Sequence, residues 1–225
     1  KPFSGMVLKA RIKNLIENRK LMKIAFGNDA REEVHEEVMQ SIEDKFVEKF
    51  RAPQGSLNGV SGYRVQIGAG KVYTPGDKCD VLVAMNAAAL KTQYKNCKPQ
   101  GTIIIDTDSF SPRDLRKAEF STDDYLKEMG IDPDRVVACP ITKMVKDCLA
   151  DIGMDNKSML KCRNMFALGL VCWLFNRDLE LVNNFLLDKF KKKLAIAEAN
   201  IKVVAAGYDY GHNIHASVPN TYRIE

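Results

Sequence analysis

Hydrophobic side chains recur at helical spacing through the first fifty residues. They form two sets, Leu8, Ile12, Leu15 and Ile16 in the first and Val34, Val38, Ile42 and Phe46 in the second. Between the sets, Phe26-Gly-Asn-Asp29 has the composition of a helix stop followed by a helix cap. The pattern therefore predicts two helices here, the second spanning residues 29–50.

The spacing changes to that of strands after a loop-like segment at residues 51–62, which is rich in Gly, Ser and Asn. Residues 63–67 alternate as a strand does, and residues 71–73 could pair with them as a hairpin. Three short apolar runs follow, at 81–85, 101–108 and 135–141, which is typical of strands buried on both faces. The segments 87–94, 112–117 and 141–152 have helical patterns, so we expect an α/β fold, a mostly parallel sheet with helices on both faces.

The last third of the chain is helical by pattern, with apolar helices at 159–175, 179–193 and 194–206. Gly207 is a predicted helix stop, and residues 211–225 resemble an extended tail. We therefore divide the chain into a divergent helical N-terminal part at 1–50, an α/β domain at 51–211 with a C-terminal helical hairpin, and an extended tail at 212–225.

Composition indicates a globular protein with its own core, since 45% of the 225 residues are hydrophobic and 28% are charged. There is no run of eighteen apolar residues that would predict a membrane span, although peripheral membrane contact stays open. The net charge is only +5, without interleaved aromatic and basic residues, so we expect no nucleic-acid partner. The first predicted helix is basic and the second is acidic, which fits either solvated faces or docking surfaces for a charged partner.

The six cysteines, at positions 79, 97, 139, 148, 162 and 172, lack the close spacing of metal ligands and of redox motifs. We expect no metal or iron–sulfur cluster in this chain, and small buried thiols in a reducing compartment.

Few side chains indicate a catalytic site. His35 lies among glutamates and is expected in solvent, and His212 and His215 are predicted surface residues because Gly211 and Pro219 disfavour a helix there. Asp106 and Asp108 follow a buried strand, where α/β proteins bind ligands, but Asp is equally common there as a turn or cap residue. The segment Gly68-Ala-Gly-Lys71 is not followed by a helical pattern, which argues against a phosphate-binding loop. We predict no catalytic and no cofactor-binding residue in this chain.

Several segments together resemble the gamma domain of 2-oxoacid:ferredoxin oxidoreductases, in particular the 2-oxoglutarate type in which gamma and alpha are fused. The first two segments are Arg51-Ala-Pro-Gln-Gly-Ser-Leu-Asn-Gly-Val-Ser-Gly-Tyr and Tyr73-Thr-Pro-Gly-Asp-Lys-Cys-Asp-Val-Leu-Val-Ala-Met-Asn86. The others are Pro140-Ile-Thr-Lys143, Asn164-Met-Phe-Ala-Leu-Gly-Leu170, Ala197-Glu-Ala-Asn-Ile-Lys202 and Ala206-Gly-Tyr208. The resemblance covers residues 51–211 and implies a Rossmann-like domain.

The resemblance also implies an enzyme complex that oxidatively decarboxylates a 2-oxo acid to an acyl-CoA and passes electrons to ferredoxin. In that family thiamine diphosphate lies between the alpha and beta parts, and the iron–sulfur clusters lie in cysteine-rich parts. The gamma domain is an accessory layer beside them. Thiamine diphosphate, CoA and the clusters are thus expected only if catalytic partner chains exist.

The sequence departs from the family near its start. Phe3-Ser-Gly-Met6 keeps only a remnant of the family's glycine turn, and the predicted acidic helix at 29–50 replaces a short strand and loop. Pro219-Asn-Thr-Tyr-Arg223 resembles the linker that leads into a fused alpha domain.

Two functions remain open. The favoured one is a non-catalytic, structural subunit of a larger complex, expected on the mitochondrial matrix side. The basic segment at residues 9–23 is similar to an organelle presequence, but an ordinary surface helix is the preferred interpretation of it. The alternative is a working gamma subunit with separate alpha and beta chains, in the cytoplasm. Both predict other protein subunits as partners, with Arg51, Gln54 and Ser61 as candidate interface residues in the loop-like segment.

Overall fold

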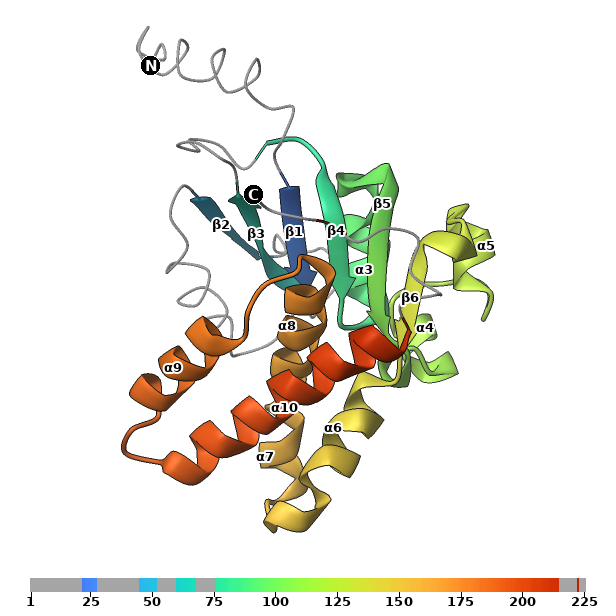
Figure 1. Ribbon diagram of the computed structural model, residues 1–225. Coiled ribbons are helices and arrows are strands. Elements are labelled where there is room, and N and C mark those ends of the chain that lie inside the picture. Colours follow the sequence, from blue (N-terminus) through green and yellow to red (C-terminus); the bar gives the residue numbers. More distant parts are fainter. Residues whose placement is uncertain (1–21, 28–44, 52–59, 68–75, 215–221, 223–225) are drawn as a thin grey trace, which may run out of the picture.

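A six-stranded sheet forms the centre of the protein (Figure 1). The computed structural model describes residues 22–27, 45–51, 60–67, 76–214 and 222. The strands are β1 (Met22–Gly27), β2 (Lys45–Arg51), β3 (Ser61–Ile67), β4 (Cys79–Ala84), β5 (Cys97–Asp106) and β6 (Val136–Cys139), in the order β2-β3-β1-β4-β5-β6. Only β3 runs against its neighbours, β1 and β2, while β1, β4, β5 and β6 pair in parallel, so the predicted mostly parallel sheet is confirmed.

Helices cover both faces of this sheet, as expected from the sequence (Figure 1). One face carries α3 (Ala87–Gln93), α4 (Pro112–Lys117) and α5 (Tyr125–Met129). The other carries α6 (Ile141–Leu149), α7 (Asn156–Leu160), α8 (Arg163–Leu174), α9 (Glu180–Lys189) and α10 (Leu194–Asn213). The described residues also form short 3-10 turns between these helices and strands, η2 (Tyr94–Asn96), η3 (Thr107–Ser109), η4 (Pro133–Arg135) and η5 (Ala150–Ile152).

The continuous apolar runs of the central strands supply two cores at once. Val81 and Val83 of β4 join the cluster under α6, α8 and α10, whereas Leu82 joins the cluster under α3 and α4. In β5, Ile104 belongs to the first cluster and Ile103 to the second. Successive side chains of a strand point to opposite faces, and this is why a strand between two helical layers is apolar at every position.

The N-terminal prediction is wrong where the structure describes it. Met22–Gly27 is strand β1, although a helix stop was expected there, and Lys45–Arg51 is strand β2, although the predicted helix extended to residue 50. The reason is long-range pairing, since β3 forms ladders with both strands. Residues 1–21 and 28–44, which hold the rest of the two predicted helices and His35, lie outside the described residues.

The predicted hairpin of residues 63–67 with 71–73 is also wrong. Strand β3 exists, but β1 occupies one of its edges and β2 the other, which leaves no edge for a further strand. Residues 71–73 lie outside the described part of the chain.

The last helix is longer than the sequence predicts. Helix α10 continues through Gly207 and Gly211 to Asn213, so the predicted stop and the start of the extended tail are both too early. Both glycines face α8, against Phe166 and Trp173 respectively, so they serve close packing of two helices rather than helix termination. Farther along, Tyr222 returns to the domain: its N–H donates to the Leu174 carbonyl at 2.8 Å.

Candidate functional site

The carboxyl ends of five strands meet at one edge of the sheet. Strands β1, β2, β4, β5 and β6 all run toward this edge, which we call the carboxyl edge. In α/β sheets, ligands bind beyond such an edge. The polar residues Asn86, Asp106 and Asp108 end or follow β4 and β5 there.

Asp106 is completely buried and fully engaged within the protein. Its Oδ2 accepts from the hydroxyls of Ser109 at 3.0 Å and Thr142 at 2.9 Å, and its Oδ1 accepts from the backbone N–H groups of Thr142 and Asp108, both at 3.3 Å. A buried carboxylate needs such partners, because leaving water is costly for a charge. Asp106 therefore stabilises the turn after β5 and its junction with α6, which is the turn-residue interpretation left open by the sequence.

Arg163, at the start of α8, completes this network and was not identified from the sequence. Its Nη1 lies 3.6 Å from Asp106 Oδ2 and donates to the hydroxyls of Ser109 and Thr142, each at 3.3 Å. The guanidinium thus neutralises the buried charge and links η3, α6 and α8. It directly precedes the Asn164 segment of the resemblance, but nothing in the local pattern distinguishes it from a surface arginine.

Asp108 is exposed, lies in η3, and caps the start of helix α6. Its Oδ2 accepts from the Lys143 N–H at 2.7 Å, in the first turn of α6. Helix α6 begins after Pro140, which provides no side-chain cap, so this carboxylate satisfies one of the N–H groups that a helix start leaves open.

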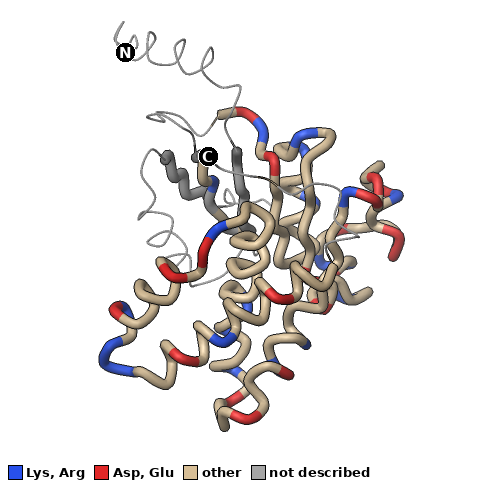
Figure 2. The backbone as a smooth tube through the Cα atoms, in the orientation of Figure 1, with Lys and Arg blue, Asp and Glu red and all other residues tan. Residues whose placement is uncertain are grey.

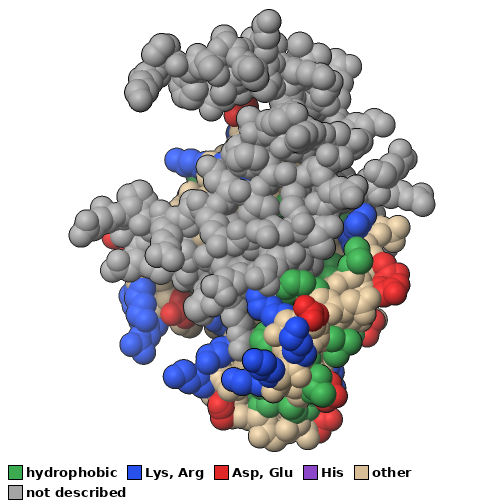
Figure 3. Space-filling model, turned by 90° about the vertical axis from the view of Figure 1, so that its left-hand side faces the viewer, with side chains coloured by type: hydrophobic (Ala, Val, Ile, Leu, Met, Phe, Trp, Pro, Cys, Tyr) green, Lys and Arg blue, Asp and Glu red, His purple; other side chains and the backbone are tan. Residues whose placement is uncertain are grey.

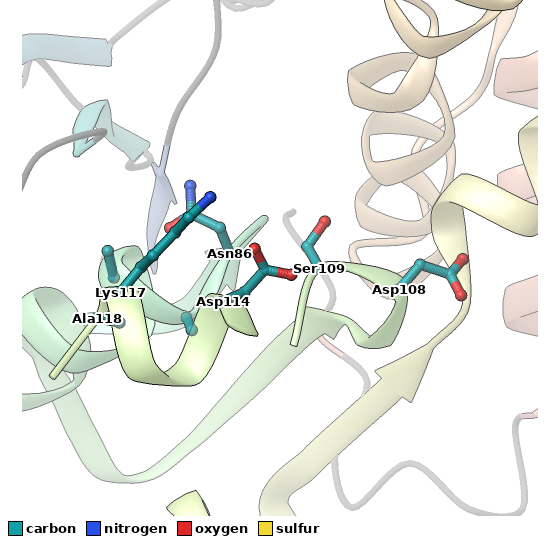
Figure 4. Close-up of a pocket in the computed structure, with 8 residues that line it drawn as sticks. Asn86, Asp108, Ser109, Asp114, Lys117 and Ala118 are labelled. Atoms are coloured by element: carbon teal, nitrogen blue, oxygen red, sulfur yellow. The ribbon is translucent and has the colours of Figure 1, made fainter. Parts of the chain in front are cut away.

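A pocket of about 270 Å³ opens beside these residues. Its polar side chains are Asn86, Asp108, Ser109, Asp114 and Lys117, and its apolar wall is Ala87, Ala88 and Ala118. Figure 4 shows Lys117 and Asp114 of α4 beside Asn86, with Ser109 and Asp108 continuing along η3.

Two of the polar side chains in this pocket stabilise the local fold. Asn86 Oδ1 accepts from the Ala89 N–H at 2.8 Å and so caps α3, and Asp114 Oδ2 accepts from the Ser111 hydroxyl at 2.5 Å. The pocket can hold a small polar molecule. Among its lining residues there is no pair of nucleophile and base.

The structure brings together two of the three predicted interface residues. Arg51 ends β2 and Ser61 begins β3, and their Cα atoms are partners in the β2–β3 ladder. Gly62, next to Ser61, pairs with Gly27 at the end of β1, which places this strand end on the carboxyl edge as well. Gln54 lies outside the described residues.

His212 is not in an extended tail as predicted but in the last turn of α10. Its ring makes edge contacts with Trp173, at 6.2 Å between centroids, and with Tyr208, at 5.0 Å. His212 is exposed, as predicted for a surface residue, and these contacts place its ring beside α8 and α10. His215 lies outside the described residues, and within the described part of the chain no three His, Cys, Asp or Glu side chains gather as metal ligands.

Comparison with known families gives one match that covers most of the chain. Residues 36–210 match the family described as pyruvate ferredoxin/flavodoxin oxidoreductase. The 2-oxoglutarate oxidoreductase subunit KorA of Mycobacterium tuberculosis is 36% identical over 200 residues, which are 88% of this chain and 29% of that protein.

Solved structures share the fold. A 2-oxoglutarate:ferredoxin oxidoreductase from Magnetococcus marinus, with 2-oxoglutarate, coenzyme A and succinyl-CoA bound, matches 92% of this chain and 33% of its own, with a TM-score of 0.64 and 21% identity. The gamma subunit of a keto/oxoacid ferredoxin oxidoreductase from Geobacter sulfurreducens matches 85% of this chain and 99% of its own length, with a TM-score of 0.55 and 17% identity. The pyruvate oxidoreductase subunit PORC from Thermotoga maritima matches 85% of this chain and 97% of its own length, with a TM-score of 0.52 and 15% identity.

The chain therefore spans about a third of the length of KorA and of the Magnetococcus chain, but nearly all of two separate small subunits. In the described residues, no helix combines the length and hydrophobicity that crossing a bilayer requires.

Proposed function

The chain belongs to the pyruvate ferredoxin/flavodoxin oxidoreductase family, and on that premise we propose that it works as the gamma part of a 2-oxoacid:ferredoxin oxidoreductase, beside partner chains that carry the catalytic centre. One observation carries the proposal: the fold is similar to that of a gamma subunit, and the match covers 99% of that subunit's length with a TM-score of 0.55. In this proposal the role of the chain is accessory, and the partner chains carry out the chemistry.

The described residues do not fit the cofactors that the resemblance implies for the whole enzyme. An iron–sulfur cluster takes four thiolates, and the described residues hold no group of even three metal-ligand side chains. The diphosphate of thiamine diphosphate or of CoA would meet the Asp114 carboxylate beside the single Lys117 in the pocket, while the Asp108 carboxylate points away toward the start of α6 (Figure 4). Like charges disfavour such binding, so any cofactor of the complex is assigned to partner chains.

We propose two docking regions for protein partners. The first is the strand end that holds Arg51 and Ser61 on the carboxyl edge. The second is the α9–α10 hairpin, on which the exposed leucines are Leu181, Leu187 and Leu194 and the turn residues include Lys191, Lys192 and Lys193. Figure 2 shows the basic residues at the turn between these helices, and Figure 3 shows basic and hydrophobic side chains on the face seen from that side. Exposed apolar groups of this kind are typical of interaction sites.

The alternative function is a non-catalytic structural subunit of a larger complex on the mitochondrial matrix side. It is supported by the hydrogen bonds that engage Asp106 within the protein. An acidic docking helix at residues 29–50 does not support it, because Lys45–Arg51 is strand β2. We therefore place the working gamma subunit first.

Affinity purification of the tagged chain from its own cells distinguishes the two functions. A working gamma subunit is expected to bring chains that bind thiamine diphosphate and iron–sulfur clusters, a brown colour, and 2-oxo acid oxidation that depends on CoA and ferredoxin. A large complex that lacks these chains and this activity contradicts the proposal and supports the structural function.

Variants of the interface residues predicted from the sequence test where the partners bind. Arg51→Ala and Gln54→Ala should reduce the yield of copurified chains at least threefold, whereas Lys157→Ala, on exposed α7, should leave it unchanged. The melting temperature of each variant controls for folding. A yield that falls equally in all three variants contradicts this placement of the interface.

A further inference from the structure

Two buried thiols face each other at the amino ends of β4 and β5, opposite the carboxyl edge of the sheet. Cys79 begins β4 and Cys97 begins β5, and their Cα atoms are partners in the β4–β5 ladder. Both cysteines are free, and they are 2% and 4% exposed. Neighbouring strands lie about 4.8 Å apart, within the range of Cα separations that a disulfide spans, roughly 4.4–6.8 Å.

Arg135 places a positive charge on one of the two thiols. Its Nη2 lies 3.3 Å from Cys97 Sγ, while the same nitrogen donates to the Lys98 carbonyl at 2.6 Å and Nε donates to the Gly101 carbonyl at 2.9 Å. Two backbone carbonyls thus hold the guanidinium against the sulfur.

The pair is electrostatically asymmetric. A hydrogen bond from the Cys79 thiol and then the Arg135 charge lower the pKa of Cys97, against burial and the Asp80 carboxylate, which act in the opposite direction. The same hydrogen bond and burial raise the pKa of Cys79. Cys97 is therefore the thiol of the pair that loses its proton more readily, and the thiolate is the reactive form of cysteine.

Solvent is close to this pair although both sulfurs are covered. The Lys98 side chain is 45% exposed and pairs with Asp80 at 2.5 Å. Tyr222 lies over the same strand ends: its hydroxyl donates to the Asp80 carbonyl at 3.3 Å and lies 3.4 Å from the Thr102 hydroxyl. A molecule the size of hydrogen peroxide would reach the two sulfurs by displacing these polar side chains.

We propose that Cys97 is a site of oxidation by hydrogen peroxide and that Cys79 resolves the product into a Cys79–Cys97 disulfide. Nothing in the other described cysteines repeats this arrangement: burial raises the pKa of Cys139 and of Cys172 to about 12 in each case. These two thiols are expected to stay reduced.

The chemistry proceeds in two steps. The Cys97 thiolate attacks one oxygen of hydrogen peroxide, so that a sulfur–oxygen bond forms, the oxygen–oxygen bond breaks and hydroxide leaves as water after taking a proton. The Cys79 sulfur then attacks the Cys97 sulfur, the sulfur–sulfur bond forms, and the hydroxyl group leaves as water with the Cys79 proton. In total two thiols lose two electrons, and one peroxide becomes two water molecules.

Mass spectrometry of the folded chain after graded exposure to hydrogen peroxide tests the proposal. The remaining thiols are alkylated before digestion. We expect the disulfide to lower the mass of the protein by two hydrogens and to leave Cys79 and Cys97 unalkylated, in one pair of linked peptides. Cys79→Ser should instead accumulate a sulfenic acid on Cys97 that dimedone traps, and Cys97→Ser should leave Cys79 as a thiol.

Arg135 supplies a second, independent readout. Arg135→Gln should slow disulfide formation severalfold, while Arg135→Lys, which keeps the charge, should recover part of the rate; melting temperatures control for folding. Cys148, which is half-buried, is the internal reference. The proposal is overturned if Cys148 is oxidised while Cys79 and Cys97 remain thiols, or if Arg135→Gln reacts as fast as the unchanged protein.

Discussion

The backbone of Gly207 in α10 lies against the backbone of Phe166 in α8, so closely that an added Cβ on Gly207 would come within 2.1 Å of the Phe166 carbonyl oxygen. The contact is reciprocal one turn away, where a Cβ on Gly169 of α8 would come within 1.9 Å of the Val204 carbonyl oxygen. The two helices therefore approach at a distance that only glycine permits, and α8 is buried along almost its whole length.

Gly207→Ala should lower the free energy of unfolding by about 2 kcal/mol, because the methyl group forces the helices apart. In an exposed helix the same change would stabilise by roughly 1 kcal/mol, so the sign of the effect tests the contact. Urea unfolding of the variant measures it. Asn184→Ala, on the exposed side of α9, is the matched control and should stay within about 0.5 kcal/mol of the unchanged protein.

Asp106→Ala should destabilise the fold by about 3 kcal/mol, since it leaves Arg163, Thr142 and Ser109 without their shared acceptor. Arg163→Met should cost less when Asp106 is already absent, which a double-mutant cycle in urea detects. Asp147→Ala, on the exposed side of α6, serves as control. Strict additivity of the two changes would show that the pair is not coupled.

Tyr222→Ala should destabilise the domain by about 2 kcal/mol, although Tyr222 is far along the chain from the sheet. Its ring stacks on Phe175, with 5.2 Å between centroids, and its hydroxyl reaches the Asp80 carbonyl. Tyr222→Phe keeps the stacking and should lose only about 1 kcal/mol. Thermal unfolding of both variants checks this order, and equal effects would assign the whole contribution to the hydroxyl group.

Stability should fall at high pH in a way that depends on Tyr210. Burial and the neighbouring Cys139 raise the pKa of Tyr210 to about 12, above the value of roughly 10 expected in the unfolded chain. The folded state thus favours the neutral phenol, and this contribution is complete below pH 10 and is lost as the pH rises toward 12.

Urea unfolding at a series of pH values between 9 and 12 measures this loss, and absorbance at 295 nm follows phenol ionisation directly. Burial also raises the pKa of Tyr125 and Tyr222, so part of the loss should persist in Tyr210→Phe. An equally steep loss in Tyr210→Phe would contradict the assignment to Tyr210.

Local signals account for the elements that the sequence predicted well. Helix α4 begins and ends at the predicted residues because Ser111 caps it and Pro112 occupies its first turn. The apolar runs of β4 and β5 predicted strands correctly, since both faces of these strands are covered. The resemblance of the segments at residues 51–211 indicated the family, which the match over residues 36–210 confirms.

The errors and omissions lie where distant segments decide. The spacing of Val38, Ile42 and Phe46 suits a helix, yet Phe46 lies in a strand because β3 provides a ladder for it. Arg163 and Asp106 are 57 positions apart and form one network only after α8 packs on the sheet, and no local pattern reveals such a pair.

The sequence by itself determined the α/β class, the central strands and the family, because hydrophobic periodicity and local motifs act over a few residues. Only the tertiary structure decided that residues 45–51 form a strand, that α10 passes through Gly207, and that Cys79 faces Cys97 beside Arg135. Each of these depends on contacts between residues far apart in the chain. Local propensity does not include the free energy of such contacts.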